Sequence, residues 1–509
     1  MKPHISWAAI PVALVLAACP DLPDRDDDGD PDAGSDGPAV NDVSCPPLAM
    51  PVATATSYVD ANASGAEAGT KDAPYKTIAK AFESAGSGGV IFVAAGNYKE
   101  NVVVPDKHLV VHGGFTSGFG SRTDGCATVV EASNVAQSVF AASASVHDFA
   151  IDGLSIQKGA HGLLVEGDGT VQATFTITSS VFSENGQVDA AGGGGSFEGV
   201  NVNVSRSVFR DNRASKGGAL AINGDISLTI EDSLFVRNIG HSDHGGGIYA
   251  GPRTGTIQRN TFRSNEIGKD LGYGWGGAVI VYKGGATPTK VDLAYNVFTD
   301  NLAGVGGAVF VDDGATITMS HDLLYRNRSI RENGVVRGAA LYADGASPGI
   351  GSFLIADHLT VTDNVYDEAG NRAEITQGGA VYAETSSKVT FTNSILWNNG
   401  SDALFGDPTT EIAVSYSVAP GQCTGVARCT IGTGVFEQDV LFVDEAANDY
   451  HEKSTAGHFH DGTFEPDAVT SPTIDRADPA ASFSNEPASN GNRANLGVYG
   501  NTAEASKSP

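Results

Sequence analysis

Basic residues are scarce in this 509-residue chain, in which 31 Lys and Arg stand against 60 Asp and Glu and the formal net charge is -29. A surface this anionic repels nucleic acid and anionic lipid headgroups, so we exclude nucleic-acid binding. The chain also has only 3 Met and 3 Trp, against 64 Gly. A composition so rich in turn residues predicts many short strands rather than the helices of an ordinary enzyme of this length.

The N-terminal apolar run, residues 8–18, is too short to cross a bilayer as a helix, and it follows Lys2. This pattern predicts a secretory signal. Leu16, Ala17, Ala18 and Cys19 resemble a bacterial lipobox, which implies cleavage before Cys19 and lipidation of its thiol. We therefore predict a signal peptide over residues 1–19 and an exported lipoprotein anchored to the outer membrane or cell surface. The alternative is an ordinary signal peptide that contains Cys19.

Four cysteines remain beyond Cys19, an even number that favours two disulfides in an exported chain. Cys423 and Cys429 are six residues apart and would most simply close a small loop. Cys45 would then pair with Cys126 and pin the segment before the fold to its first turns. Four free thiols are the alternative, which an oxidising compartment disfavours.

Residues 20–50 are rich in Asp, Pro and Gly and have too few apolar side chains to offset the entropy lost on ordering, so we predict a disordered acidic linker. Alternating carboxylates within it resemble the calcium loops of thrombospondin type 3 repeats, which implies a Ca²⁺ site. These carboxylates are Asp24, Asp26, Asp28, Asp30 and Asp32. A solvated tether without calcium is the alternative, since the helices of an EF-hand and its Glu at loop position 12 are absent.

The folded region begins with an amphipathic helix, because Ile78, Ala81, Phe82 and Ala85 are spaced i, i+3, i+4 and i+7 after Thr77 as N-cap. Short apolar runs at 90–93, 102–104 and 109–111 follow and predict strands. The stretches "APYKTIAKAF" and "AAGNYKEN" resemble the opening of right-handed parallel β-helix proteins of the pectin-lyase-like class. The resemblance implies that the helix covers the open end of the first coil, where a bare strand edge would invite aggregation.

A Phe-x-x-Asn unit or a variant of it recurs along the chain, and its Asn falls at positions 185, 212, 238, 265, 301, 327, 364 and 399. The steps are 27, 26, 27, 36, 26, 37 and 35 residues, and such a period predicts a solenoid. Side chains at one register of a solenoid point the same way, so the Phe rings should stack in an interior ladder. These rings are Phe182, Phe209, Phe235, Phe262 and Phe298. The Asn side chains should bond to one another at a turn and take left-handed backbone geometry there.

Glycine pairs supply the next corner of each coil, where a side chain would clash. The pairs are 217–218, 245–246, 276–277, 306–307 and 378–379. Together, "FRDN", "FTDN", "GGAL" and "GGAV" resemble the repeats of chlamydial polymorphic outer membrane proteins over roughly residues 180–400. Members of that family are surface-displayed and associated with adhesion, which the resemblance implies here. A leucine-rich repeat has a similar period but needs Leu at several fixed positions, which this chain lacks.

These observations predict an all-β fold, a right-handed parallel β-helix solenoid over residues 51–440 with an N-terminal capping helix. Residues 441–509 should form a C-terminal capping tail, because solenoids need closed ends. Part of this tail, "SPTIDRADPA", resembles the tails of secreted β-helix proteins. Those tails usually carry Ala-Gly where Arg476 and Ala477 stand in this chain.

Most of the variation in coil length falls between each closing Asn and the next Gly corner. The insertions therefore lie on one edge of the solenoid. Insertions on a rigid scaffold build binding surfaces. The edge carries His241, Asp243, His244, Lys269, Asp270, Tyr273, Trp275, Arg328, Arg331, Arg337, Tyr366, Asp367, Glu368 and Arg372. Rings beside charged groups suit sugars, so we predict that Tyr273, Trp275, Arg331 and Tyr366 of a monomer bind a carbohydrate or a protein surface. Solvated loops without a ligand are the alternative.

A polysaccharide lyase or hydrolase that acts on uronic-acid polymers is the alternative function, which the pectin-lyase-like resemblance implies. Lyase chemistry needs a base, and a cation beside the uronate carboxylate. The edge offers Tyr and Arg side chains for these roles. The aspartates and the Gly-His-Gly of polygalacturonases are absent, and His241 and His244 have no third metal ligand at a suitable spacing. We therefore favour a binding protein, with calcium as its one candidate cofactor.

Overall fold

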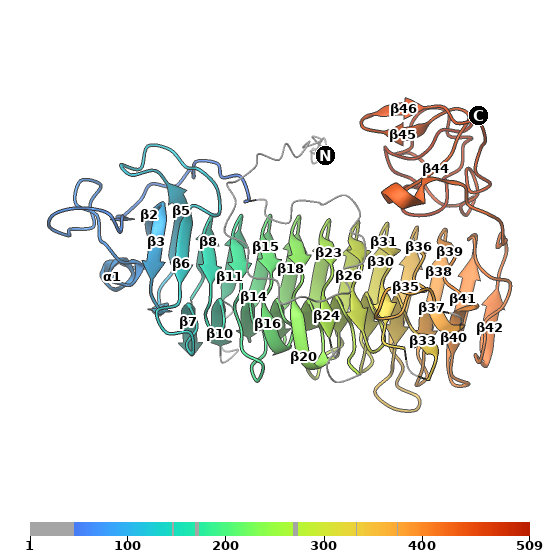
Figure 1. Ribbon diagram of the computed structural model, residues 1–509, viewed down its shortest axis with the longest axis horizontal. Coiled ribbons are helices and arrows are strands. Elements are labelled where there is room, and N and C mark those ends of the chain that lie inside the picture. The colour runs from blue at the N-terminus through green and yellow to red at the C-terminus, as the bar shows by residue number, and fades with distance from the viewer. Residues whose placement is uncertain (1–44, 145–146, 168–172, 268–272, 332, 374) are drawn as a thin grey trace, which may run out of the picture.

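The protein is an elongated solenoid, shown as a computed structural model in Figure 1. The structure describes residues 45–509 apart from 145–146, 168–172, 268–272, 332 and 374. The signal sequence, Cys19 and the carboxylates from Asp24 to Asp32 lie outside the described residues. Within the described part, no helix combines the length and the apolar character that a membrane crossing needs.

A typical coil contributes one strand to each of three long parallel sheets, which we number 1 to 3 in the order in which the chain visits them. Sheet 1 has 14 strands: β1 (Ser57–Val59), β2 (Gly89–Ala94), β5 (Leu109–Phe115), β8 (Phe149–Asp152), β11 (Thr174–Thr178), β14 (Asn201–Ser205), β18 (Ser227–Glu231), β22 (Thr254–Gln258), β26 (Lys290–Ala294), β30 (Thr316–Ser320), β35 (Phe353–Asp357), β38 (Lys388–Thr392), β41 (Glu411–Ser415) and β42 (Arg428–Ile431). Sheet 2 has 11 strands: β3 (Gly96–Lys99), β6 (Thr128–Glu131), β9 (Ser155–Gln157), β12 (Val181–Ser183), β15 (Val208–Arg210), β19 (Leu234–Val236), β23 (Thr261–Arg263), β27 (Val297–Thr299), β31 (Leu323–Tyr325), β36 (Thr360–Thr362) and β39 (Ile395–Trp397).

Two further sheets complete the coils. Sheet 3 has 12 strands: β4 (Val102–Val103), β7 (Phe140–Ala144), β10 (Leu163–Gly167), β13 (Gly195–Glu198), β17 (Leu220–Asn223), β21 (Ile248–Gly251), β25 (Val279–Val281), β29 (Val309–Val311), β33 (Val335–Arg337), β34 (Leu341–Ala343), β37 (Ile375–Ala383) and β40 (Asp402–Gly406). Sheet 4 has five short strands between sheets 2 and 3: β16 (Arg213–Lys216), β20 (Ile239–His244), β24 (Glu266–Ile267), β28 (Leu302–Ala303) and β32 (Arg328–Ser329). The edge that carries the insertions is therefore partly a sheet, where we expected loops.

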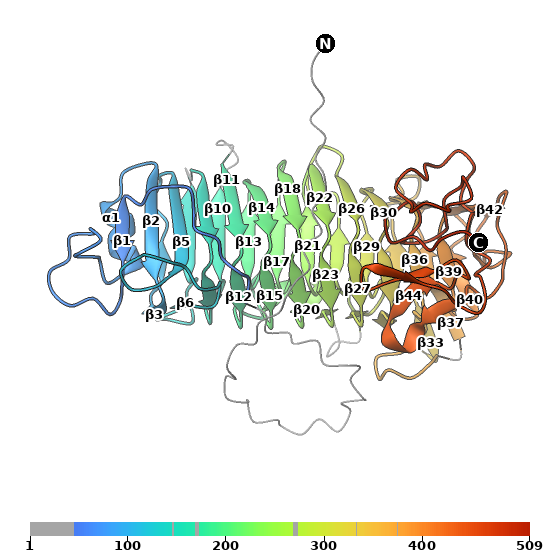
Figure 2. The same cartoon turned by 90° about the horizontal axis from the view of Figure 1, so that it is seen from above.

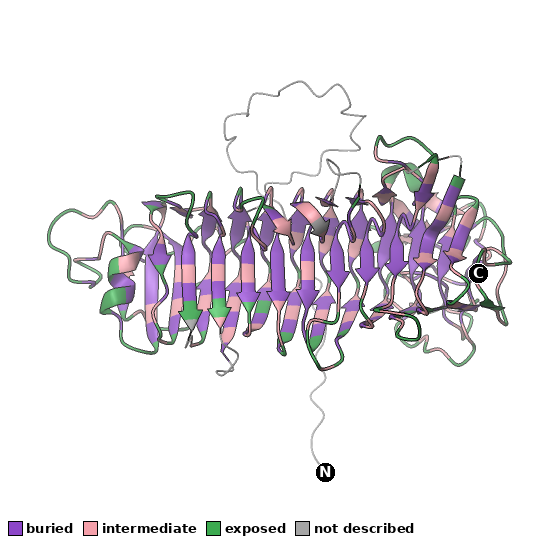
Figure 3. Cartoon of the chain, turned by 90° about the horizontal axis from the view of Figure 1, so that it is seen from below, coloured by how far each residue is buried: buried purple, intermediate pink, exposed green. Residues whose placement is uncertain are grey.

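Alternating side chains explain why these short segments are strands. In β11, Phe175 and Ile177 are buried in the interior, whereas the intervening Thr residues lie half-buried on the outside. β-Branched Thr suits the outer, half-solvated face of a pleated sheet. Figure 3 shows the buried interior continuing along the whole solenoid.

The Phe residues of the repeat form the predicted interior ladder. Neighbouring rings from Phe182 through Phe209, Phe235 and Phe262 to Phe298 stack with centroids 4.9, 5.1, 4.8 and 4.9 Å apart. Each ring is fully buried. The distances match the spacing of parallel strands, so each coil places its ring directly over the last.

The buried Asn residues form the predicted polar ladder beside these rings. In each coil the Asn Nδ2 donates to the Oδ1 of the next Asn, as in Asn185 to Asn212 at 3.1 Å and Asn238 to Asn265 at 2.9 Å. The left-handed geometry, however, belongs to the residue before each Asn. Asp211, for example, has φ of 57°. Our expectation for the Asn backbone was wrong because that side chain bonds inside the coil, while the outward-pointing neighbour makes the turn.

The glycine pairs meet the geometry predicted for them. The first residue of each pair has positive φ, such as 59° at Gly217 and 67° at Gly306. A Cβ on the second, Gly218, would lie 2.5 Å from the carbonyl oxygen of Gly246 in the next coil. The close approach of coils therefore excludes a side chain at this corner.

A second polar ladder, which the sequence reasoning missed, lies at the turn between sheets 1 and 2. Its members stand five residues before an Asn of the first ladder: Ser180, Ser207, Ser233, Asn260, Asn296, Asp322 and Ser394. One coil interrupts the ladder, because Leu359 occupies the position there. Each polar side chain accepts the backbone N–H of the preceding coil, as Ser207 Oγ does from Ser180 at 3.2 Å. The constant spacing of five residues was the available signal.

Helix α1 (Ile78–Ser84) lies at the N-terminal end of the solenoid, as predicted (Figure 1). The Thr77 side chain accepts from the Lys80 backbone N–H, and both oxygens of the Glu100 carboxylate accept from N–H groups of the first turn at 2.9 Å. Phe82 is buried, and its ring centroid lies 5.8 Å from that of Phe149 in the first coils. The helix therefore covers the hydrophobic interior at this end.

The C-terminal segment packs on the outer face of sheet 2, which Figures 1 and 2 show beside β36 and β39. It contains the antiparallel pairs β43 (Phe442–Asp444) with β44 (Asp449–Glu452) and β45 (His458–His460) with β46 (Thr463–Glu465), and the 3-10 turn η1 (Glu445–Ala447). Tyr450 lies 4.9 Å from Tyr325 between ring centroids, and the imidazole of His321 contacts the carbonyl of Gly500 at 3.0 Å. We expected a cap over the open end, whereas these contacts lie on the flank.

Both disulfides join the predicted cysteines. Cys45 and Cys126 bond at 2.07 Å across 81 residues, and Cys423 and Cys429 bond across 6 residues. Beside the first disulfide, Arg122 donates to the carbonyl of Ala49 at 2.7 Å. The segment that precedes the fold is thereby fastened to the first coils.

Candidate functional site

Trp275 of the predicted edge lies beside sheet 4 and is held there by isolated backbone bridges. Trp275 pairs through its backbone with His244 in the preceding coil and Val305 in the following coil. Its half-buried ring lies 4.9 Å from the imidazole of His244 and packs against the cluster of Ile280, Phe310 and Tyr342. Trp275 is therefore partly a core residue of this edge.

Tyr273 and Trp275 lie together beside a small cavity of about 100 Å³, lined also by Gly274, Gly304, Val305, Ile330 and Arg337. The Tyr273 side chain is 51% exposed, so its ring faces solvent at the mouth of the cavity. The volume lies below the 300 Å³ or so of ordinary small-molecule sites. The cavity is therefore too small to enclose a whole small-molecule ligand. Lys269 and Asp270, predicted beside it, lie outside the described residues.

Arg331 and Tyr366 are placed in the next insertion rather than in the lining of this cavity. The backbone of Tyr366 pairs with Arg328 and Arg372. The Arg331 guanidinium lies 3.7 Å from the Asp367 carboxylate, and its backbone N–H donates to Glu368 at 2.8 Å. The charge of Arg331 is thus balanced within its own insertion, and Arg337 is the cation that the structure brings to Tyr273 and Trp275.

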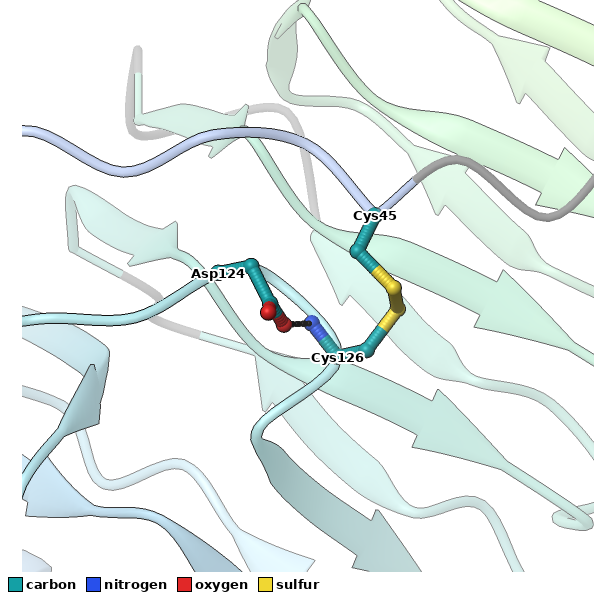
Figure 4. Close-up of a disulfide and its surroundings, with 3 residues drawn as sticks. All are labelled: Cys45, Asp124 and Cys126. Carbon is teal, nitrogen blue, oxygen red and sulfur yellow. Dashed lines mark hydrogen bonds between the residues drawn. A yellow bond between two sulfur atoms is a disulfide. The ribbon is translucent and has the colours of Figure 1, made fainter. Parts of the chain in front are cut away.

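The edge does not assemble a metal centre among the described residues. The one group with metal-ligand spacing in the described chain is Cys45, Asp124 and Cys126. Figure 4 shows that its two sulfurs are joined in a disulfide, while Asp124 accepts the backbone N–H of Cys126 at 2.9 Å. Disulfide sulfurs have no thiolate to offer a metal. These residues therefore fasten the fold.

The outer face of sheet 3 carries a column of stacked rings next to Trp275. Phe310, Tyr342, Tyr382 and Phe405 follow one another with centroids 5.0, 4.9 and 5.2 Å apart. Phe310 and Tyr342 are buried, and the Tyr342 hydroxyl donates to Glu384, so the faces and polar groups of these two rings are already engaged. The column therefore stabilises the sheet, whereas Tyr273 is half-exposed.

A row of carboxylates follows these rings at the ends of β29, β34 and β37. Burial, together with the adjacent Asp313 carboxylate, raises the pKa of the Asp312 carboxyl to about 7. Burial also raises the pKa values of Asp344 and Glu384, and Tyr342 donates its hydroxyl to Glu384 at 2.8 Å. The sequence reasoning missed this row. The available signal was an acid at a fixed position in the three stretches "GGAVFVD", "GAALYAD" and "GGAVYAE". In each stretch it stands four residues after the Ala at the third position.

The comparison with protein families agrees with the fold. The family described as right handed beta helix region matches residues 138–323. No curated protein matches the chain. Among solved structures, a pectin methylesterase from carrot is similar with 13% sequence identity over 77% of this chain and 91% of that chain, at a TM-score of 0.27. The parallel sheets and the family match together define a right-handed parallel β-helix, as predicted.

Proposed function

We propose that the protein is an exported binding protein of the cell surface, anchored by a lipid on Cys19, that recognises a glycan or a partner surface through Tyr273 and Trp275. The observation that carries the proposal is the half-exposed Tyr273 beside a cavity whose other lining residues include Trp275 and Val305, which pair through their backbones, and Arg337 of β33. A rigid aromatic anchor loses little entropy when a ligand binds, which favours recognition.

The anchor rests on the N-terminal sequence. The lipobox-like residues 16–19 and the acidic residues 20–44 would place the solenoid on a polar tether outside the membrane. Two disulfides fit an exported chain, because they persist in oxidising compartments. The surface display and adhesive role of the proteins that its repeats resemble are consistent with this arrangement.

The test compares retention of the purified chain on immobilised neutral polysaccharides before and after Tyr273→Ala. We expect retention to fall about tenfold, which corresponds to the loss of about 1.4 kcal/mol of ring stacking. Tyr295→Ala is the matched control, because that ring is 49% exposed and lies on a different corner of the solenoid. Retention that Tyr273→Ala leaves unchanged would rule out the proposed site.

A glycoside hydrolase is the second candidate, and Asp312 is the observation that favours it. A carboxyl whose pKa is about 7 retains a proton on about half of the molecules at neutral pH and can protonate a leaving oxygen, while a second carboxyl of the row, such as Asp344, would have to act as base. The carboxylates of the row would repel a uronic-acid polymer, so we expect a neutral substrate. Arg337, whose charge partly offsets the rise that burial causes in the pKa of Glu384 in the same row, donates its Nε to Gln377 at 3.0 Å.

Release of reducing ends from neutral polysaccharides tests this candidate. Asp312→Asn should abolish the release, whereas Asp313→Asn should retain it and shift its alkaline limit to lower pH, because the Asp313 charge helps to hold the proton on Asp312. If the chain releases no reducing ends from any polysaccharide tested, the hydrolase candidate is excluded and binding remains the one proposed function.

A further inference from the structure

A groove of about 550 Å³ lies between the last coils and the C-terminal segment, far in sequence from the edge described above. Its volume is that of an ordinary small-molecule site. The groove is lined by Arg476, Arg493, Tyr416, Phe436, Pro472 and Pro479, with Gln438 and Thr433 among its polar residues. Among the described residues no Asp or Glu lines it, although the chain has 60 acidic residues.

The two arginines of the groove have no carboxylate partner among the described residues. Arg493 is fixed in place, because its guanidinium donates to the backbone carbonyls of Arg476 and Ala477. The exposed Arg476 side chain makes no hydrogen bond or ion pair with the described part of the chain. Two arginines without an ion-pair partner that line one groove give it a positive potential, which favours a negatively charged ligand.

The acidic residues nearest in sequence to Arg476 are engaged elsewhere. Asp475 accepts from the hydroxyl of Ser508 at 2.8 Å, and Asp478 accepts from the backbone N–H of Ala480 at 2.8 Å. Neither carboxylate forms an ion pair with Arg476 or Arg493 in the described part of the chain.

We propose that this groove binds an acidic sugar residue, whose carboxylate or sulfate pairs with Arg476 and Arg493. Guanidinium groups bind planar and tetrahedral oxyanions through paired N–H donors. The rings of Tyr416 and Phe436 and the two prolines give the C–H faces of a sugar an apolar surface, and Gln438 and Thr433 can bond its hydroxyls. A free inorganic ion would use none of these apolar contacts.

The test measures binding of the full chain to four probes by titration calorimetry: an oligogalacturonide, a sulfated galactan fragment, a neutral galactan fragment and inorganic phosphate. We expect binding of the carboxylated or the sulfated sugar, the stronger of the two identifying the anion, and no binding of the neutral fragment. Arg476→Gln should weaken it about tenfold or more, because one charged hydrogen-bond donor is lost. Arg206→Gln, which removes an exposed arginine on the opposite half of the solenoid, should leave the affinity unchanged.

Four outcomes would overturn the proposal: equal binding of neutral and acidic fragments, phosphate binding as tight as that of the sugars, an unchanged affinity in Arg476→Gln, or loss of acidic-sugar binding in Tyr273→Ala. The last outcome would assign the acidic sugar to the edge. Failure of Tyr273→Ala to affect neutral polysaccharides bears on the proposed function alone, so the two proposals fail separately.

Discussion

Asp322 occupies a position in the second polar ladder that an Asn would fill better. It is fully buried, and its Oδ1 accepts from the backbone N and the Nδ2 of Asn296 at 2.8 and 2.9 Å. Its Oδ2 has no hydrogen-bond partner among the described residues. In the preceding coil, Asn296 donates Nδ2 to the carbonyl of Ile257, and the register places Leu293 as the equivalent acceptor for residue 322. Asp322→Asn should therefore supply a donor where the carboxylate has none.

The size of the effect follows from the titration of this carboxyl. Burial raises the pKa of Asp322 from 3.8 to about 7. A folded-state pKa above the unfolded value means that the folded chain keeps a proton that the unfolded chain has lost, so stability falls as the pH rises from about 4 to about 7 and is level above that. About three pKa units correspond to about 4 kcal/mol at pH 8. Asn cannot ionise, so Asp322→Asn removes this loss.

Urea unfolding of both proteins at pH 4 and pH 8 measures the difference. We expect the variant to exceed the natural chain by about 1 kcal/mol at pH 4, from the added hydrogen bond, and by several kcal/mol at pH 8. Asn260→Asp is the converse control, since it places a second carboxyl in the ladder two coils away and should destabilise the chain increasingly above pH 4. If Asp322→Asn lowers the free energy of unfolding, or raises it by the same amount at pH 4 and pH 8, the reasoning is refuted.

The other predictions concern the interior, the disulfides and the anchor. Phe262→Ala should leave a cavity between stacked rings and lower the free energy of unfolding by about 3 to 5 kcal/mol, and a loss below about 1 kcal/mol in urea titration would contradict the buried ladder. Replacing both cysteines of the disulfide that spans 81 residues should cost about 4 kcal/mol, against about 2 kcal/mol for the one that spans 6, because the longer loop restricts the unfolded chain more. Cys19→Ser should move the protein from the membrane fraction to the soluble fraction in fractionated cells, and an unchanged distribution would exclude lipidation.

The repeating part of the fold could be predicted because each coil gives its residues the same surroundings. Phe262 stacks on a Phe of the coil on each side, and Asn265 bonds to the Asn of the next coil. A residue type that recurs at a fixed spacing in the sequence therefore indicates the same position in every coil. The second ladder escaped notice because its role requires only an acceptor for a backbone N–H. Ser233, Asn260 and Asp322 all satisfy that need, and the varied residue types hide the common position.

The candidate site was predicted in part. The order of residues located Tyr273 and Trp275 on one edge, since insertions of a solenoid leave at a common corner. It could not show that Arg337 rather than Arg331 reaches the cavity, because that choice depends on the local ion pair with Asp367. The docking of the C-terminal segment was likewise hidden, because contacts such as that of His321 with Gly500 occur once and follow no period.

The C-terminal segment changes how the solenoid responds to a mechanical load. Its hydrogen bonds reach back to Thr360 and Asn393, and its buried Tyr450 meets Tyr325 in β31, two strands before the last strand of sheet 2. A pull on the C-terminus would therefore act first on these contacts with the inner coils. The final coils would carry the load only after the contacts with Tyr325, Thr360 and Asn393 had broken.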